Sequence, residues 1–125
     1  GELPVLVEKP AAYFIEHNDG LRTTLLMLNG AIKDFCFACE ADGEIVSTQF
    51  FLSPTPNVTY SACLVAKIEE MIETDKAPFP AERTLIVSGA LESCLTSKVE
   101  DHKTLETPHL SLTYEAPDES HHARF

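Results

Sequence analysis

Two cysteines, Cys36 and Cys39, have the C-x-x-C spacing shared by metal-binding and redox motifs. They lie in an apolar stretch with strand character, and side chains three apart in a strand point to opposite faces of a sheet. Such a pair cannot hold one metal ion together, and a redox role requires the lowered thiol pKa found at a helix N-terminus. We therefore expect both thiols, like Cys63 and Cys94, to be buried, unreactive and reduced.

The histidines are dispersed along the chain, at positions 17, 102, 109, 121 and 122. His121 and His122 are adjacent, but no third ligand on a rigid element accompanies them, so no metal site is predicted. The glycines, at positions 1, 20, 30, 43 and 89, have neither the dinucleotide-binding nor the P-loop spacing. We expect this chain to bind no nucleotide cofactor and no metal, and we assign no catalytic residue.

Four residues are candidates for lining a substrate pocket: Asn57, Tyr60, Arg83 and His109. They fall where the predicted sheet, helices and last strand meet. Arg83 would hold a carboxylate or hydroxyl groups, and His109 would form a hydrogen bond. The alternatives are a structural ion pair for Arg83, for example with Glu106, and a structural or exposed position for His109.

Three turn signals divide the first half of the chain, where Asn, Asp and Gly tolerate the positive φ of tight hairpins, at 18–20, 29–30 and 42–43. Runs rich in β-branched and aromatic residues lie between them, at 13–17, 21–28, 33–39 and 45–52. They predict a four-stranded antiparallel meander. Residues 25–28 are all apolar, so both faces of the second strand should be covered, by a helix and by another subunit.

The prolines in 53–57 end the meander, and the apolar period then becomes helical, with Leu64, Ile68 and Met71 on one face. Pro80 is well placed to start a second helix, which runs to about Ser97. This helix is apolar over much of its circumference, so it should be buried, either in the core or in an interface. Residues 109–114 alternate like a strand. The predicted fold class is α+β: an antiparallel meander of about four strands, two helices packed on one face, and one further C-terminal strand.

The length of 125 residues fits a single domain over 1–125, with an ordered core at about 10–115 and a disordered tail at 116–125. The net charge of −11 repels phosphate backbones and anionic lipid, so neither nucleic acid nor membrane is an expected partner. No apolar run reaches the ~20 residues of a membrane span, and no signal peptide is recognisable. We expect a cytoplasmic protein.

Several segments resemble one protein family: 19–22, 27–30, 56–60, 68–71, 106–110 and, most specifically, the Lys-Ala-Pro-Phe-Pro-Ala-Glu-Arg-Thr-Leu run at 76–85. Together they are similar to the C-terminal portion of oxidoreductase-like proteins of the glucose–fructose oxidoreductase / inositol dehydrogenase / MocA superfamily, over roughly residues 10–115. Glu8-Lys9-Pro10 has the form of the family's catalytic-lysine motif. It precedes a predicted strand rather than a helix, so the catalytic role is not carried over to Lys9.

The resemblance implies that NAD(P) binds to an N-terminal Rossmann domain outside this chain. It also implies that the α+β domain forms homo-oligomers through its sheet face and shapes a pocket for a sugar-like ligand. The expected function is therefore a non-catalytic C-terminal domain of an oxidoreductase-like protein. One alternative is a stand-alone small-ligand-binding or isomerase-like protein, in which His109 acts with Glu106 or Arg83. The other is a dimerisation module without a ligand.

Overall fold

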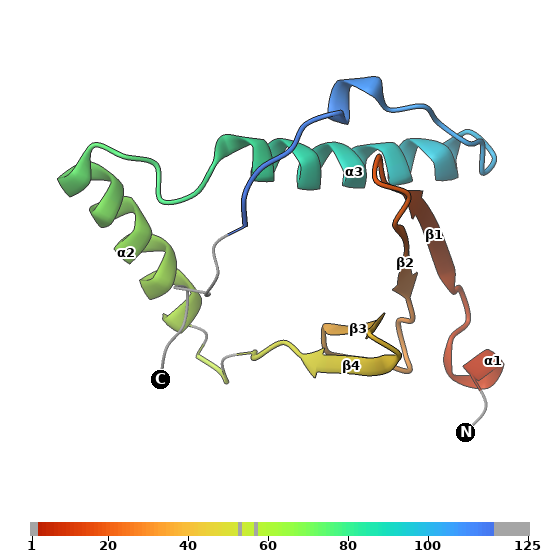
Figure 1. Ribbon diagram of the computed structural model, residues 1–125. Coiled ribbons are helices and arrows are strands. Elements are labelled where there is room, and N and C mark those ends of the chain that lie inside the picture. The colour runs from red at the N-terminus through yellow and green to blue at the C-terminus, as the bar shows by residue number, and fades with distance from the viewer. Residues whose placement is uncertain (1–2, 53, 57, 117–125) are drawn as a thin grey trace. The chain divides into compact units, whose positions relative to one another are not determined.

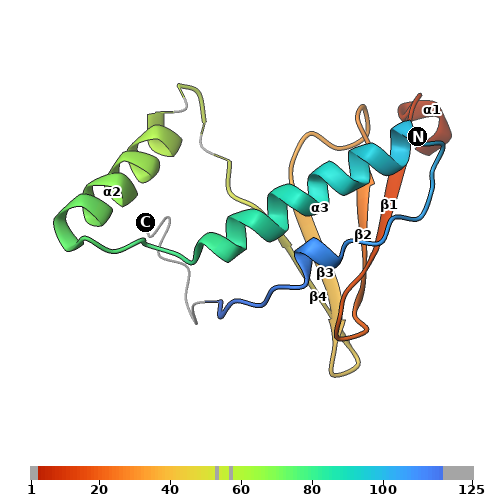
Figure 2. The ribbon, with the colours of Figure 1, turned by 90° about the horizontal axis from the view of Figure 1, so that it is seen from above.

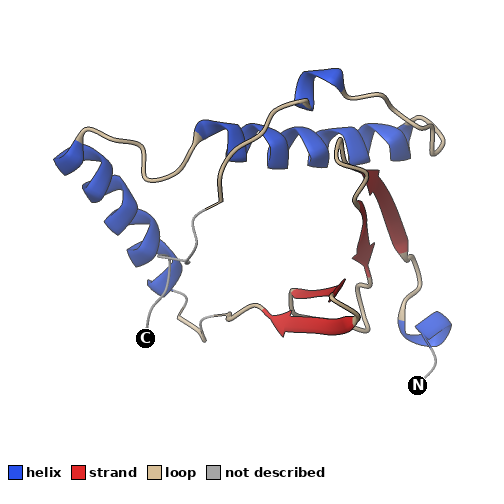
Figure 3. Cartoon of the chain, viewed as in Figure 1, coloured by secondary structure: helices blue, strands red, loops and turns tan. Residues whose placement is uncertain are grey.

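The structure is a computed structural model, and it describes residues 3–52, 54–56 and 58–116. It divides into two compact units, Gly1–Pro54 and Thr55–Phe125. The first unit contains the short helix α1 (Leu3–Leu6) and the strands β1 (Ala11–Glu16), β2 (Arg22–Met27), β3 (Cys36–Ala41) and β4 (Glu44–Gln49). The second contains the helices α2 (Val58–Thr74) and α3 (Ala81–Val99) and the 3-10 turn η1 (Pro108–Leu110) (Figures 1 and 3). The predicted α+β class is confirmed; the single-domain organisation stays a prediction.

The β1–β2 hairpin is closed by the first predicted turn. Asp19 accepts a hydrogen bond from the Leu21 backbone N–H at 2.9 Å, and Gly20 has a φ of 85°. Such a turn needs a residue that adopts positive φ without steric cost. The register places Glu16 opposite Arg22, and their opposite charges suit a cross-strand pair.

The two faces of the β1–β2 hairpin both carry apolar side chains. Tyr13 lies opposite Leu25, and both point to one face, where Tyr13 is half-buried. On the other face, Phe14 is 82% exposed and Leu26 is 56% exposed. The prediction that the second strand is apolar on both sides is therefore confirmed, while its predicted covering by a helix and another subunit stays a prediction.

The β3–β4 hairpin is closed by Asp42 and Gly43, which have φ values of 53° and 79°. Positive φ at both central residues fits the right-handed twist of a two-residue hairpin. Cys36 pairs with Gln49 and Cys39 pairs with Val46, so the two thiols lie on opposite faces, as predicted.

The predicted single meander is corrected to two separate two-stranded sheets, because β2 does not pair with β3 in the described chain. At the expected second hairpin turn, the N–H groups of Ala31 and Ile32 both donate to the Leu28 carbonyl at 3.1 Å, which makes a compact turn. Gly30 has a φ of 106°, and its Cα lies so close to the Leu6 carbonyl that a Cβ would not fit. After β2 the chain therefore forms this compact turn, and β2 and β3 do not form a hairpin.

The helices α2 and α3 follow the predicted boundaries closely. Pro80 is the N-cap residue with extended backbone angles, and α3 begins immediately after it. The helix ends where the Glu100 N–H donates to the Thr96 carbonyl at 2.8 Å. Cys94 is the one buried side chain of α3 among the described residues, so burial in a core is not observed there, and burial in an interface stays a prediction.

The predicted C-terminal strand at 109–114 is also corrected. The Leu110 N–H donates to the Thr107 carbonyl at 2.9 Å, and the Ser111 N–H donates to Pro108 at 3.2 Å, which closes the η1 turn. Pro108 opens this turn because its fixed φ suits a helical first position and its missing N–H is not required there. Of the predicted disordered tail at 116–125, residues 117–125 lie outside the described part of the chain.

The η1 turn packs against α3, and Figure 2 shows it beside that helix. The contact depends on Gly89, because a Cβ at this position would overlap the Leu110 side chain. Glycine is unfavourable inside a helix by about 1 kcal/mol relative to alanine. Gly89 lowers the stability of the helix by this amount, but it allows the Leu110 side chain to approach α3 closely.

Burial is limited throughout the described residues. The buried apolar side chains are Val7 and Cys94, and no described polar or charged side chain is buried. No described helix is both long and apolar enough to cross a membrane. Most large apolar side chains of both units are exposed, so each unit has apolar surface available for contacts.

A double-mutant cycle tests the contact between Gly89 and Leu110. We expect Gly89→Ala alone to lower the free energy of unfolding by up to ~1 kcal/mol, because the overlap outweighs the gain in helix propensity. In a Leu110→Ala background the overlap is gone, and the same change should stabilise by up to ~1 kcal/mol. Urea unfolding measures both. Equal effects in the two backgrounds would show that η1 does not pack on α3.

Candidate functional site

The predicted pocket residues lie in different elements. Asn57 lies outside the described residues. Tyr60 is in the first turn of α2, Arg83 is in the first turn of α3, and His109 is in η1. None of these three described residues lines the groove between the helices α2 and α3.

Arg83 forms a cation–π contact instead of the ion pair considered from the sequence. Its guanidinium carbon lies 5.1 Å from the centre of the Phe79 ring. Contacts of this kind contribute about 0.5–1 kcal/mol at exposed sites. The contact ties the start of α3 to the preceding loop, and it occupies one face of the Phe79 ring with a cation.

The second unit has a groove between α2 and α3, with a volume of about 640 Å³. We call it the α2–α3 groove. It is lined by residues 64, 67, 68 and 71 of α2, 77–79 of the connecting loop, and 81, 84, 85 and 88 of α3. Its volume lies within the range of about 300–1,000 Å³ that is typical of ligand sites.

The sequence produces this groove through helical periodicity and two prolines. Leu64, Ile68 and Met71 recur at helical spacing, and so share one face of α2. Pro78 and Pro80 lie in the connection, where the missing N–H groups prevent one helix from continuing into the other. Figure 1 shows α2 and α3 leaving this connection in different directions. The apolar face of α2 therefore lines the groove, together with a face of α3 that carries Ala81, Leu85 and two hydroxyl residues, Thr84 and Ser88.

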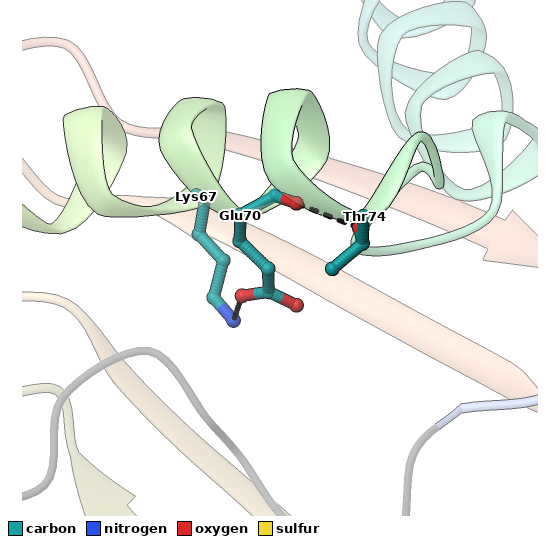
Figure 4. A network of polar contacts seen from close by, with 3 residues as sticks. All are labelled: Lys67, Glu70 and Thr74. Atoms are coloured by element: carbon teal, nitrogen blue, oxygen red, sulfur yellow. Dashed lines mark hydrogen bonds and ion pairs between the residues drawn. The ribbon is translucent and has the colours of Figure 1, made fainter.

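The one charged residue that lines the groove is neutralised by a neighbour on the same helix. Lys67 Nζ lies 2.6 Å from Glu70 Oε2, and the Lys67 side chain is 20% exposed. Thr74 Oγ1 donates to the Glu70 carbonyl at 2.6 Å, one turn further along α2 (Figure 4). The groove therefore presents apolar atoms and a neutral ion pair, a surface suited to binding apolar groups rather than to acid–base chemistry.

The described residues form no candidate metal site, and their cysteines differ in burial. No group of three or more His, Cys, Asp or Glu is placed there to hold a metal ion. The expectation that all four cysteines are buried is wrong for Cys36 and Cys39, which are exposed, and Cys63 is half-buried. Cys94 is buried as predicted, and burial raises the pKa of its thiol by disfavouring the thiolate.

Sequence reasoning identified the components of the groove without identifying the groove. The apolar stripe of α2 and the 76–85 run are both features of the sequence, but the pocket residue predicted in that run is Arg83, whereas its apolar neighbours line the groove. The available signal was the pair of prolines between two amphipathic helices. When a helix ends at such a connection, its apolar face is not necessarily covered by the helix that follows.

Comparisons with known proteins give no match: no family model, no curated protein and no solved structure is similar to this chain.

The cysteines should differ in their reaction with iodoacetamide. We expect Cys36 and Cys39 to be alkylated first, because they are exposed. Cys94 should react much more slowly, and its rate should rise only at higher pH, because a raised pKa leaves less thiolate at any given pH. Peptide mapping after timed alkylation at several pH values measures this order. Alkylation of Cys94 as fast as Cys36 would contradict the burial described here.

Proposed function

We propose that this chain is a non-catalytic assembly domain that forms homo-oligomers through the face of the β1–β2 hairpin carrying Phe14 and Leu26. The observation that carries the proposal is that this two-stranded sheet has apolar side chains on both faces. An isolated two-stranded hairpin is at best marginally stable in water. Contact with a second copy would add apolar burial and stabilise it.

Charge favours the β1–β2 hairpin over the β3–β4 hairpin as the contact surface. Residues 36–49 include Glu40, Asp42 and Glu44 and no basic residue. Two copies of that hairpin would bring like charges together, which is unfavourable across strands and interfaces. Residues 11–27 of the β1–β2 hairpin include Glu16, Asp19 and Arg22, a net charge of −1 against −3 for residues 36–49, and Glu16 lies opposite Arg22.

The proposal has a narrower form, which rests on the sequence motifs alone. In this form, the chain is the C-terminal domain of a cytoplasmic oxidoreductase-like protein, and NAD(P) binds to an N-terminal Rossmann domain. A sugar-like ligand would then contact Asn57, Tyr60, Arg83 and His109. Four cysteines without a disulfide are compatible with a reducing compartment.

A matched pair of substitutions tests the assembly surface. Phe14 and Ile45 are both 82% exposed, and they lie on different hairpins. We expect Phe14→Glu to convert an oligomer into a monomer, because the new carboxylate would be desolvated in the interface. Ile45→Glu should leave the oligomer intact. Light scattering at micromolar concentrations measures the mass; a monomeric parent chain, or equal effects of both changes, would refute the assignment.

The narrower form is tested by the intact mass of the endogenous protein. We expect a species heavier than 13.8 kDa by about 100–150 residues or more, the size of an additional domain. Mass spectrometry of the purified native protein gives the value. A species of about 13.8 kDa would instead favour a stand-alone ligand-binding protein and leave no place for the dinucleotide-binding domain.

A further inference from the structure

We propose that the α2–α3 groove binds a single small amphiphile, whose apolar body lies on the groove lining and whose carboxylate contacts Arg83 at the edge of the groove. This site is separate from the β1–β2 hairpin face, so the inference does not depend on homo-oligomer formation. The ligand class also differs from the sugar-like ligand of the narrower proposal, and a sugar therefore serves as a comparison in the test.

The lining of the groove suits the apolar body of such a ligand. Apart from Lys67, the lining residues are uncharged. They include four large apolar side chains that are exposed: Leu64, Ile68, Met71 and Leu85. The lining covers residues 64–71 of α2 and 81–88 of α3, and each stretch is about 10 Å long at the rise of an α-helix. An alkyl chain that lies along this surface removes apolar atoms of both partners from water.

The charged groups at the groove favour an anionic head group. Lys67 is the one charged residue that lines it, and no described carboxylate does so. Arg83 places a second cation at the edge, because its guanidinium carbon lies 5.1 Å from the centre of the Phe79 ring, and Phe79 lines the groove. A guanidinium donates two parallel hydrogen bonds to a carboxylate. One cation balances the single charge of a carboxylate, whereas a phosphate monoester carries nearly two charges.

Arg83 is the cation that can make this contact. Lys67 Nζ lies 2.6 Å from Glu70 Oε2, so its charge is already balanced. Arg83 forms no ion pair within the described part of the chain, and stacking on Phe79 leaves its N–H groups able to donate. Stacking also restricts the Arg83 side chain before a ligand binds, which lowers the entropy lost on binding. The net charge of −11 repels anions at long range, but salt screens this effect over about 8 Å.

Titration of the full chain with four probes, followed by ¹H–¹⁵N NMR, tests the inference. Decanoate should bind about three- to tenfold more tightly than decanol, which has the same chain without the charge. It should bind at least about tenfold more tightly than butyrate, which has the charge on a short chain. The amides that shift should lie within residues 64–88. Glucose should shift none of them.

A matched pair of variants tests the contact with the carboxylate. Arg83→Gln should lower the affinity for decanoate to that for decanol and leave the affinity for decanol unchanged. Lys98→Gln removes the same charge from the last turn of α3, outside the groove lining, and should change neither affinity. If both substitutions weaken decanoate binding equally, only the overall charge matters, and the assignment of the carboxylate to Arg83 is wrong.

A second pair tests the contact with the apolar body. Leu85 lines the groove and Leu95 does not, yet both are leucines of α3 with 51% exposure. Leu85→Ser should weaken the binding of decanoate and decanol alike, by roughly three- to tenfold, because it removes apolar contact area. Leu95→Ser should leave both affinities unchanged. Circular dichroism checks that each variant keeps its helices, and the probe series on the parent chain requires no variant.

Several results would overturn the inference. Equal affinities for decanoate and decanol would remove the argument from charge, and an absence of shifts within residues 64–88 would remove the site. Shifts of the same amides by glucose would instead support the sugar-like ligand. Sedimentation of the chain with phosphatidylglycerol vesicles, lost in Arg83→Gln, would assign the site to a lipid surface rather than to a single molecule. Repeating the titrations on Phe14→Glu separates these results from a failure of the assembly proposal.

Discussion

Burial of apolar surface is the constraint on which the rest of this structure depends. A sheet of two strands has two faces, and a helix that touches another only near their connection leaves most of its stripe uncovered. Both situations occur here: Phe14 and Leu26 are exposed on one hairpin, and Leu64 and Leu85 are exposed beside the connection of two helices. Because folding is stabilised mainly by removing such side chains from water, contacts with other surfaces are the natural source of further stability.

The features that the sequence predicted well are local ones. Asp42-Gly43 closes a hairpin because both residues accept positive φ. The stripe of Leu64, Ile68 and Met71 forms one helix face because side chains three and four apart lie on the same side. The opposite orientation of Cys36 and Cys39 follows from the two-residue period of a strand. Each needs only neighbours within a few residues, so a single sequence contains the required information.

The features that could not be predicted depend on partners distant in the chain. Asn29-Gly30 has the sequence of a hairpin turn. In the structure, Gly30 instead allows the close approach of the Leu6 carbonyl. Alternation at 109–114 looks like a strand, but Pro108 opens a turn that packs Leu110 against Gly89. The apolar neighbours of Cys36 suggested burial, yet nothing in a local sequence tells whether a sheet face is covered. Tyr60, Arg83 and His109 do not line the α2–α3 groove, and their role in a pocket stays a prediction.

The connection between α2 and α3 both lines the groove and fixes the position of Arg83. Its residues Pro78, Phe79 and Pro80 belong to the run at 76–85, in which Arg83 is the expected pocket residue. In the structure, the prolines separate two helices, Phe79 lines the groove between them, and Arg83 is held against the Phe79 ring. A guanidinium that stacks on an aromatic ring retains its charge and its N–H donors. The same segment therefore contributes apolar atoms to the groove and holds a charged guanidinium beside it, because Phe79 takes part in both contacts.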